Sequence, residues 1–312
     1  MIASTQPTLS SSLKATIARH PAGAFLVFLY VTSWILFLPA LLGTLGIGVV
    51  PIDIPAQPSI LLLSLIALAG GAFLITRIAD GKEGTRELRR RYFTWRTGPQ
   101  WYLLALFGAP LLLLVAGAVV QGPGSLSAFG AKLTEFVPTY LLQVVLIALL
   151  ISIWEETGWM AFLTARWQKR FGPVLASIAV APLFGLVHFP LLFISGGITD
   201  SGRLAASEYP EYLIYLLVLF SVPVRLILTW VFNSTGGALP VVALLHASFD
   251  TTASGAILTG FYPGVDGRLM YVGLAIVALA VLLITRGRLG YRQVTPATQR
   301  VTIPAPAPLP LS

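Results

Sequence analysis

Long uncharged stretches alternate with short polar ones along most of the chain. Eight apolar runs stand out, and each is close to the roughly 20 residues that a helix needs to cross the hydrocarbon core of a bilayer. The runs cover residues 22–42, 58–77, 100–120, 138–165, 173–195, 212–232, 238–258 and 269–286. This pattern predicts an all-α fold, a polytopic membrane helix bundle with about eight transmembrane helices.

The two ends of the chain differ from this pattern. Residues 1–20 start with a Ser/Thr-rich stretch, and we expect them to form a flexible cytoplasmic segment. Residues 291–312 include the stretch TPATQRVTIPAPAPLPLS, whose Pro/Ala-rich composition favours extended, disordered chain. The integral membrane domain is therefore expected to cover residues 21–290.

Composition supports the membrane interpretation. Of the 312 residues, 56% are hydrophobic and only 10% are charged, whereas a soluble domain carries roughly 25% charged residues. Cysteine is absent. This absence excludes disulfides, thiolate metal sites and cysteine nucleophiles.

The basic residues predict an orientation for the bundle. Four basic clusters fall on one side of an eight-span arrangement, whereas the opposite polar segments carry only Lys132, Arg203 and Arg268. The clusters are Lys14 and Arg19; Arg77, Lys82, Arg86, Arg89, Arg90, Arg91 and Arg96; Arg166, Lys169 and Arg170; and Arg286, Arg288, Arg292 and Arg300. By the positive-inside rule both termini are cytoplasmic. The net charge of +8 then reflects membrane topology and predicts a lipid bilayer as partner, with no nucleic acid.

Five ionisable residues lie well inside the predicted spans: Glu155, Glu156, His188, His246 and Asp250. A charged side chain in the hydrocarbon core costs at least roughly 2.5–3.5 kcal/mol, so such residues are rare and usually face the interior of a bundle. Counted at about 1.5 Å per residue from the basic ends of their spans, all five fall at similar depths. One such residue alone would be read as a hydrogen-bonded packing residue, but five together predict a functional site.

Local spacing assigns these residues to helix faces. His246 and Asp250 are four residues apart and share a face, as do Phe184 and His188. Glu155 and Glu156 point about 100° apart, so one is expected to do chemistry while a partner holds the other. Arg225 is a further cation within a span, and it could snorkel to the interface or pair with a buried carboxylate.

Two kinds of chemistry fit this set of side chains. A buried glutamate can act as a general base on water, while a histidine donates to an oxyanion or a leaving amine. Alternatively, Glu155, His188, His246 and Asp250 could hold a divalent metal such as zinc. Neither an H-E-x-x-H helix nor a nucleophile elbow is present, and the spacing alone does not separate the two mechanisms.

Three segments resemble the motifs of the CAAX protease and bacteriocin-processing family of intramembrane proteases. The family pattern is E-E-x-x-x-R, then F-x-x-x-H, then H-x-x-x-N or a similar polar residue. Here EETGWMAFL contains Glu155 and Glu156, FGLVH runs from Phe184 to His188, and LLHASFD contains His246 and Asp250. The resemblance covers about residues 138–258, which would form the catalytic half.

The resemblance implies an intramembrane endopeptidase that hydrolyses a membrane-associated or prenylated peptide at a prokaryotic plasma membrane. Glu155 would activate water with help from His188, while His246 and Asp250 would stabilise the tetrahedral oxyanion. Members of the family have been described both as metalloproteases and as metal-free glutamate proteases. The resemblance therefore leaves the cofactor open, and it names no substrate beyond a peptide or protein, lipidated or not.

The chain departs from the family pattern at two positions. Met160 stands where the pattern has arginine, which leaves Glu156 without its usual partner. Glu156 could then be protonated, Arg225 or Arg166 could substitute, or the protein could be a non-catalytic scaffold or immunity-type member. Asp250 replaces asparagine, a milder change. A cation transporter is a further alternative, because buried acids and histidines also mark ion pathways.

Overall fold

The computed structural model describes residues 9–197 and 204–292, and every regular element within these ranges is helical. In chain order the elements are α1 (Leu9–Arg19), α2 (Pro21–Leu42), α3 (Gln57–Leu62), η1 (Leu63–Gly70), α4 (Gly71–Ala79), α5 (Gly81–Arg90), η2 (Arg91–Phe93), α6 (Pro99–Gln121), α7 (Gly124–Gly130), α8 (Leu133–Ile147), η3 (Ala148–Ser152), α9 (Ile153–Glu156), η4 (Thr157–Thr164), α10 (Ala165–Phe171), α11 (Pro173–Leu186), η5 (Phe189–Phe193), η6 (Ala206–Glu208), α12 (Tyr209–Ile214), η7 (Tyr215–Phe220), α13 (Ser221–Ser234), α14 (Leu239–Ala253), α15 (Gly255–Phe261) and α16 (Leu269–Ile284).

The predicted helix bundle is confirmed, and all eight apolar runs are helical. Six continuous helices are long and apolar enough to cross a membrane: Pro21–Leu42, Gln57–Ala79, Pro99–Gln121, Leu133–Phe171, Pro173–Phe193 and Ala206–Ser234. The seventh run is broken, because α14 and α15 meet at an angle of 61°. The eighth, α16, has only 16 residues. By length, the described residues therefore give six spans, or seven with the bent pair.

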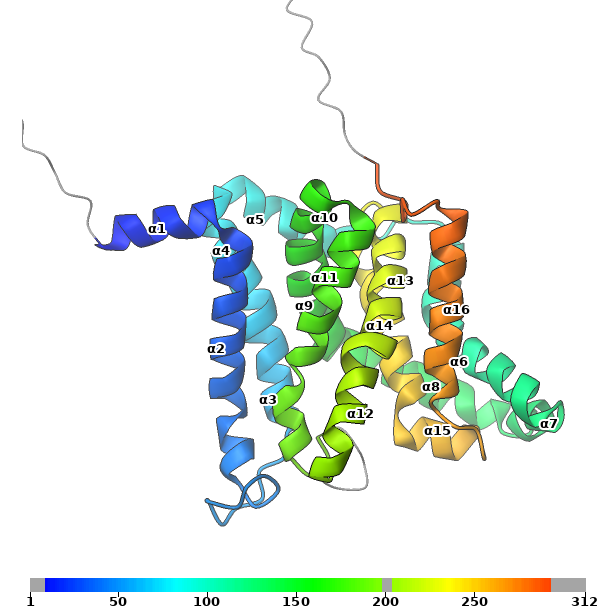
Figure 1. The fold of residues 1–312 in the computed structure, drawn as a ribbon. Helices are drawn as coiled ribbons and strands as arrows, with labels where there is room; N and C mark the ends of the chain where they lie inside the picture. The colour runs from blue at the N-terminus through cyan, green and yellow to red at the C-terminus, as the bar shows by residue number, and fades with distance from the viewer. Residues whose placement is uncertain (1–8, 198–203, 293–312) are drawn as a thin grey trace, which may run out of the picture.

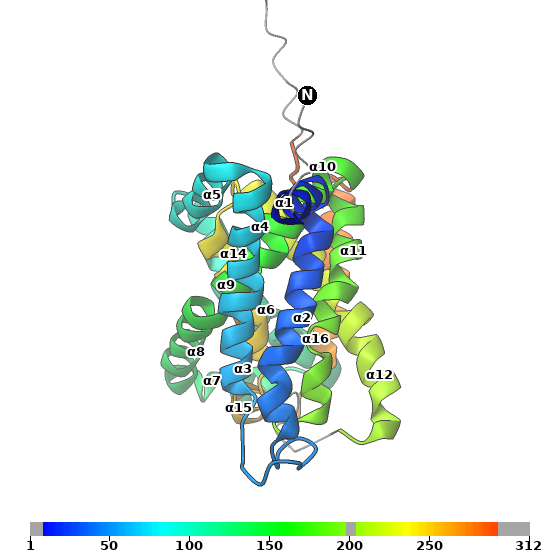
Figure 2. The same ribbon diagram turned by 90° about the vertical axis from the view of Figure 1, so that its left-hand side faces the viewer.

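The segments that carry the basic clusters gather at one end of the bundle. Figure 1 shows α1, α5, α10 and the chain after α16 at this end, which we call the basic end. Figure 2 shows the same arrangement from the side, with α12 and α15 toward the opposite end. The grouping agrees with the predicted orientation, although which side of the membrane the basic end faces remains a prediction.

The terminal segments were predicted only in part. The expectation of a flexible segment over residues 1–20 did not anticipate α1, which projects sideways from the basic end and contacts α2 and α4. Residues 1–8 and 293–312 lie outside the described residues, so the predicted disorder of the tail stays a prediction.

Three of the apolar spans contain π-helical segments. They are η1 in the second, η3 and η4 in the fourth, and η7 in the sixth. Side chains record the wider turn: Trp154 Nε1 donates to the carbonyl of Leu149 at 2.9 Å, and Thr164 Oγ1 donates to that of Trp159 at 2.7 Å, each five residues back. Such segments occur often at functional sites because they rotate the helix face.

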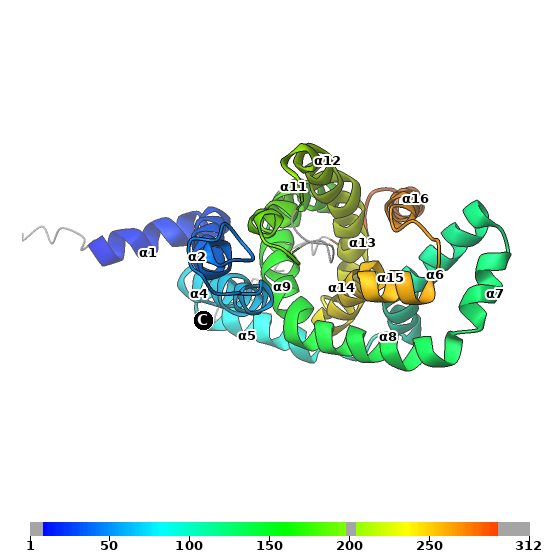
Figure 3. The ribbon, with the colours of Figure 1, turned by 90° about the horizontal axis from the view of Figure 1, so that it is seen from below.

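The candidate site residues occupy the centre of the bundle. Viewed along the bundle in Figure 3, α9, α11, α13 and α14 surround one central region, flanked by α2 and α4 on one side and by α6 and α16 on the other. The hairpin between α10 and α11 turns at Gly172, whose φ of +78° suits glycine, and Pro173 starts α11. This tight turn packs α11 back against η4, next to the two glutamates.

Candidate active site

The two adjacent glutamates point to different neighbours, as their spacing on a helix predicts. Both are buried on α9 between the segments η3 and η4, with relative exposures of 4% for Glu155 and 0% for Glu156. Glu155 Oε1 accepts a hydrogen bond from Ser64 Oγ at 3.1 Å, across the bundle on η1. Glu156 instead faces α13 and α14.

Arg225 is the partner of Glu156. Its Nη2 lies 2.5 Å from Glu156 Oε1, and both side chains are fully buried. The other candidate, Arg166, pairs with Asp80 and stacks its guanidinium 3.8 Å from the ring centre of Phe162. Of the alternatives that the sequence left open, substitution by Arg225 is the one observed.

Met160 packs against the helix that supplies this replacement. Its sulfur accepts a contact from Thr229 Oγ1 at 3.9 Å, and Thr229 lies four residues after Arg225 on α13. Met160 is fully buried. The cation at Glu156 has thus moved from the glutamates' own helix to the neighbouring helix, and an apolar side chain fills the position where the family pattern has arginine.

His246 lies between two carboxylates. Its Nδ1 is 2.8 Å from Glu156 Oε1, and its Nε2 is 3.4 Å from Asp250 Oδ2. A histidine can donate from both ring nitrogens only as the imidazolium. His246 is 2% exposed, whereas the Asp250 side chain is 39% exposed, so the longer and looser contact is on the more open side of the site.

Phe184 joins the two histidines. Its ring centre lies 5.2 Å from that of His188 and 5.7 Å from that of His246. The Arg225 guanidinium stands 4.8 Å from the same ring, and Trp159 packs edge-on at 5.9 Å. This aromatic ring separates the imidazoles and faces the cation, an arrangement that lowers the cost of burying the charge.

His188 lies within the span Pro173–Phe193 but just after the regular helix α11. Helix α11 ends at Leu186, and His188 occupies the turn before η5. Its Nδ1 lies 2.9 Å from the carbonyl oxygen of Phe184. If Nδ1 carries the proton and donates to that oxygen, Nε2 is left as an acceptor for a polar ligand.

The five predicted residues lie in one region of the bundle, but only some of them are in direct contact. Glu156, His246 and Asp250 form a chain of direct contacts, and His188 joins it through Phe184. Within the described residues, Glu155 and His188 make no hydrogen bond or ion pair with the other three. Sequence reasoning missed Ser64, because a serine in an apolar helix carries no signal for a contact with a glutamate 91 positions away.

The possible ligands of a divalent metal are Glu155, His188, His246 and Asp250. Among the described residues, no group of three or more His, Asp or Glu side chains converges on a position that one ion could occupy. The mechanism proposed for this site therefore uses protein side chains and water, and chelation tests the metal alternative.

Comparison with known proteins is consistent with the motif resemblance. Residues 137–252 match a family model described as Rce1-like, type II CAAX prenyl endopeptidase. A curated protein of Methanococcus maripaludis, CAAX prenyl protease 2, is 28% identical over 141 residues, which is 42% of this chain and 51% of that protein. The chain thus matches about half the length of this relative. All five predicted site residues and Arg225 lie in the matched segment of the family model.

Proposed function

We propose that the chain is an intramembrane endopeptidase of the CAAX prenyl protease and bacteriocin-processing family, on the match of residues 137–252 to the family model and the similarity to CAAX prenyl protease 2. The proposed substrate is a membrane-associated or prenylated peptide, in keeping with the name of the relative, CAAX prenyl protease 2. The protein is a multi-pass membrane protein. We place it in a prokaryotic plasma membrane with its basic end toward the cytoplasm.

The observation that carries the proposal is a buried carboxylate, Glu155, next in the chain to Glu156, which contacts His246. Glu155 has one oxygen held by Ser64, so its second oxygen is available to take a proton from water. The resulting hydroxide attacks the carbonyl carbon of the substrate, and a carboxylate base contributes typically 10²–10⁴-fold to such a step. When the tetrahedral intermediate collapses, the C–N bond breaks and Glu155 returns the proton to the leaving amine. His188 orients the water, because its Nδ1 is turned to the Phe184 carbonyl and its Nε2 is left for a ligand.

His246 stabilises the oxyanion that forms. Glu156 holds Nδ1, which leaves the more loosely held Nε2 edge, beside Asp250, for the substrate oxygen. As an imidazolium, His246 can donate to the oxyanion where charge develops, the type of interaction that contributes most in acyl transfer. Glu156 and Arg225 act as a positioning pair, since they fix the imidazole without reaching the reacting carbonyl.

The scaffold alternative loses its main support. It rested on Met160 leaving Glu156 unpaired, but Arg225 supplies the missing cation. The transporter alternative requires a polar path across the bilayer, and among the described residues the buried ionisable side chains gather in one cluster. Neither alternative has an observation of its own in its favour.

The proposal is tested by peptide cleavage in lipid nanodiscs. We expect the purified protein to cut members of a pool of membrane-anchored and prenylated peptides, with His188→Ala and His246→Ala variants losing on the order of 10²-fold or more in kcat/KM. Equal cleavage by the wild type and both variants would refute the assignment. If no protein preparation cleaves any peptide in the pool, the scaffold alternative gains.

Asp250 can be tested with the residue that the family pattern prefers. Asparagine in place of Asp250 keeps the size of the side chain and can still donate from its amide nitrogen, so we expect Asp250→Asn to retain activity within about tenfold. Asp250→Ala removes both donor and acceptor and should lose on the order of 10²-fold. Michaelis–Menten measurements on one cleaved peptide compare the two. An alanine variant as active as the asparagine variant would exclude Asp250 from the oxyanion site.

Metal dependence is tested by chelation. Because the donors do not converge on one ion position, we expect full cleavage activity after dialysis against EDTA and 1,10-phenanthroline. Elemental analysis of the same sample reports the remaining zinc per protein. Activity that disappears with the metal and returns on adding zinc would replace the glutamate mechanism with a metal-assisted one.

A further inference from the structure

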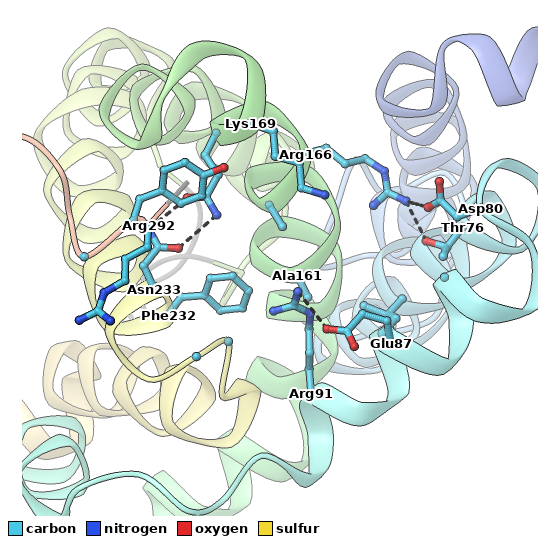
Figure 4. A pocket seen from close by; sticks show the side chains of 18 residues that line it. Thr76, Asp80, Glu87, Arg91, Ala161, Arg166, Lys169, Phe232, Asn233 and Arg292 are labelled. Atoms are coloured by element: carbon cyan, nitrogen blue, oxygen red, sulfur yellow. Dashed lines mark hydrogen bonds and ion pairs between the residues drawn. The ribbon is translucent and has the colours of Figure 1, made fainter. Parts of the chain in front are cut away.

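A polar cavity of about 1100 Å³ opens at the basic end, apart from the candidate active site. Figure 4 shows its wall, to which α5, α10 and α13 all contribute side chains. The charged lining residues are Asp80, Glu87, Arg91, Arg166, Lys169 and Arg292. None of the five candidate site residues lines it, so it is a separate site.

The cavity carries more positive than negative charge. Four cations and two carboxylates line it, which leaves a formal surplus of two. Both carboxylates are already used, Asp80 by Arg166 and Glu87 by Arg91 at 3.4 Å and Arg90 at 2.8 Å. Lys169 and Arg292 make no hydrogen bond or ion pair within the described residues. The surplus positive charge of the cavity therefore lies on Lys169 and Arg292.

No other acidic residue of this end can neutralise them. The third acidic residue there, Glu83, pairs with Arg86 at 3.2 Å. Residues 1–8 and 293–312 contain neither Asp nor Glu. The charge of Lys169 acts on Glu87 without an ion pair between them, so Lys169 and Arg292 remain available to an anion from another molecule.

The wall of the cavity is held by specific contacts. Gln168 on α10 and Asn233 on α13 exchange amide hydrogen bonds of 3.0 and 3.1 Å. Asn233 Nδ2 also donates to the carbonyl of Leu289 at 3.1 Å, which ties the chain that leads to Arg292 against α13. Lys169 and Arg292 thus stand on segments that side-chain contacts already join.

Arg91 forms a second fixed part of the wall. Its guanidinium lies 5.1 Å from the ring centre of Phe232, and it approaches Gly237 so closely that a Cβ there would come within 2.0 Å of Nη1. Burial lowers the pKa of the Arg91 guanidinium, because it removes water that would stabilise the charged form. The hydrogen bond from Arg90 lowers the pKa of Glu87, which keeps this acid ionised beside Arg91.

We propose that this cavity binds a phosphate-bearing anion through Lys169 and Arg292. A phosphate group brings up to two negative charges and several acceptor oxygens, which suits a lysine and an arginine that line one cavity. Basic pockets at the cytoplasmic ends of membrane helices take lipid head groups, and the volume also suits a soluble phosphorylated metabolite. This inference does not depend on the peptidase activity.

Two probes distinguish the sources of the phosphate. The full-length protein in uncharged detergent is titrated calorimetrically with dioctanoyl phosphatidic acid and, separately, with inorganic pyrophosphate. We expect saturable binding of at least one probe. Tighter binding of the lipid assigns the cavity to a head group of the membrane, and tighter binding of pyrophosphate assigns it to a soluble phosphate. Without saturable binding of either probe, the proposal fails.

Matched variants then locate the binding. Lys169→Gln/Arg292→Gln removes the two unpaired cations, and we expect the Kd to rise about tenfold or more. Arg170→Gln/Arg288→Gln removes the same charge from the same two segments but outside the cavity, and should change Kd by less than about twofold. Equal weakening by both would show that only general surface charge attracts the probe. The single variant Lys169→Gln repeats the comparison if the double variant folds poorly.

Discussion

Replacing Glu155 by glutamine is expected to lower kcat by on the order of 10²–10⁴-fold while leaving the fold intact. Glutamine keeps the size of the side chain, and its carbonyl oxygen can still accept the hydrogen bond from Ser64. It cannot accept a proton from water. The loss of kcat therefore reports the contribution of Glu155 as a general base. Initial-rate measurements on a cleaved peptide quantify this loss.

A glutamate on the same span serves as the control. Glu135 is exposed near the start of α8, in the same continuous helix as Glu155. We expect Glu135→Gln to keep full activity and an unchanged melting temperature. If Glu155→Gln keeps more than about half of the wild-type kcat, another group activates the water, and Glu156 becomes the next candidate.

Replacing Arg225 by methionine is expected to give the largest loss of stability. The change leaves the Glu156 carboxylate buried without its cation. Breaking a buried ion pair from one side costs about 3–5 kcal/mol in the free energy of unfolding. Because Glu156 also contacts His246 Nδ1 at 2.8 Å, activity should fall as well. Reversible unfolding in mixed detergent micelles measures the stability.

Two further variants separate charge from packing. Met160→Arg combined with Arg225→Met returns the cation to the glutamates' own helix, and we expect it to recover a substantial part of the lost stability and activity. Arg166→Met removes the other candidate cation, whose pair with Asp80 is partly exposed, and should cost about 1 kcal/mol or less. An Arg225→Met protein as stable as the wild type would show that the Arg225–Glu156 ion pair does not stabilise the fold.

The sequence predicted the helices well because hydrophobic run length is a direct physical requirement of the bilayer. It did not predict where those helices are interrupted. The break between α14 and α15 follows the polar stretch Thr251, Thr252 and Ser254, and the Ser254 side chain accepts from the backbone of Ile257 as the N-cap of α15. These capping residues are visible in the sequence. The apolar residues on either side of them nevertheless made the whole segment read as one hydrophobic run.

The end of α11 had a similar signal. Pro190 has no backbone N–H, and its ring clashes with the carbonyl four residues earlier, that of Leu186, where α11 ends. This local rule favours the observed turn at His188 over the continuous span that hydrophobicity suggested. The sequence contains no comparable signal for the π-helical segments around the glutamates. Their change to i→i+5 hydrogen bonds depends on how neighbouring helices pack.

The partner of Glu156 could be narrowed from the sequence but not chosen. Arg225 and Arg166 were both available cations, and the sequence did not decide between them. The structure selects Arg225, which is 69 positions away, because α13 packs beside η4 while Arg166 lies nearer the basic end beside Asp80. Long-range pairing of this kind follows from tertiary packing, which one sequence does not encode in its local pattern.

The central claim is that Glu155 activates water to cut a peptide bond inside the membrane. Mass spectrometry of the products formed in heavy-oxygen water tests it most directly, with the wild type and Glu155→Gln incubated with the same cleaved peptide in nanodiscs. We predict one heavy oxygen in the new terminal carboxylate of the wild-type product, and no product above background from the variant. Labelled product formed at the same rate by both proteins would contradict the account.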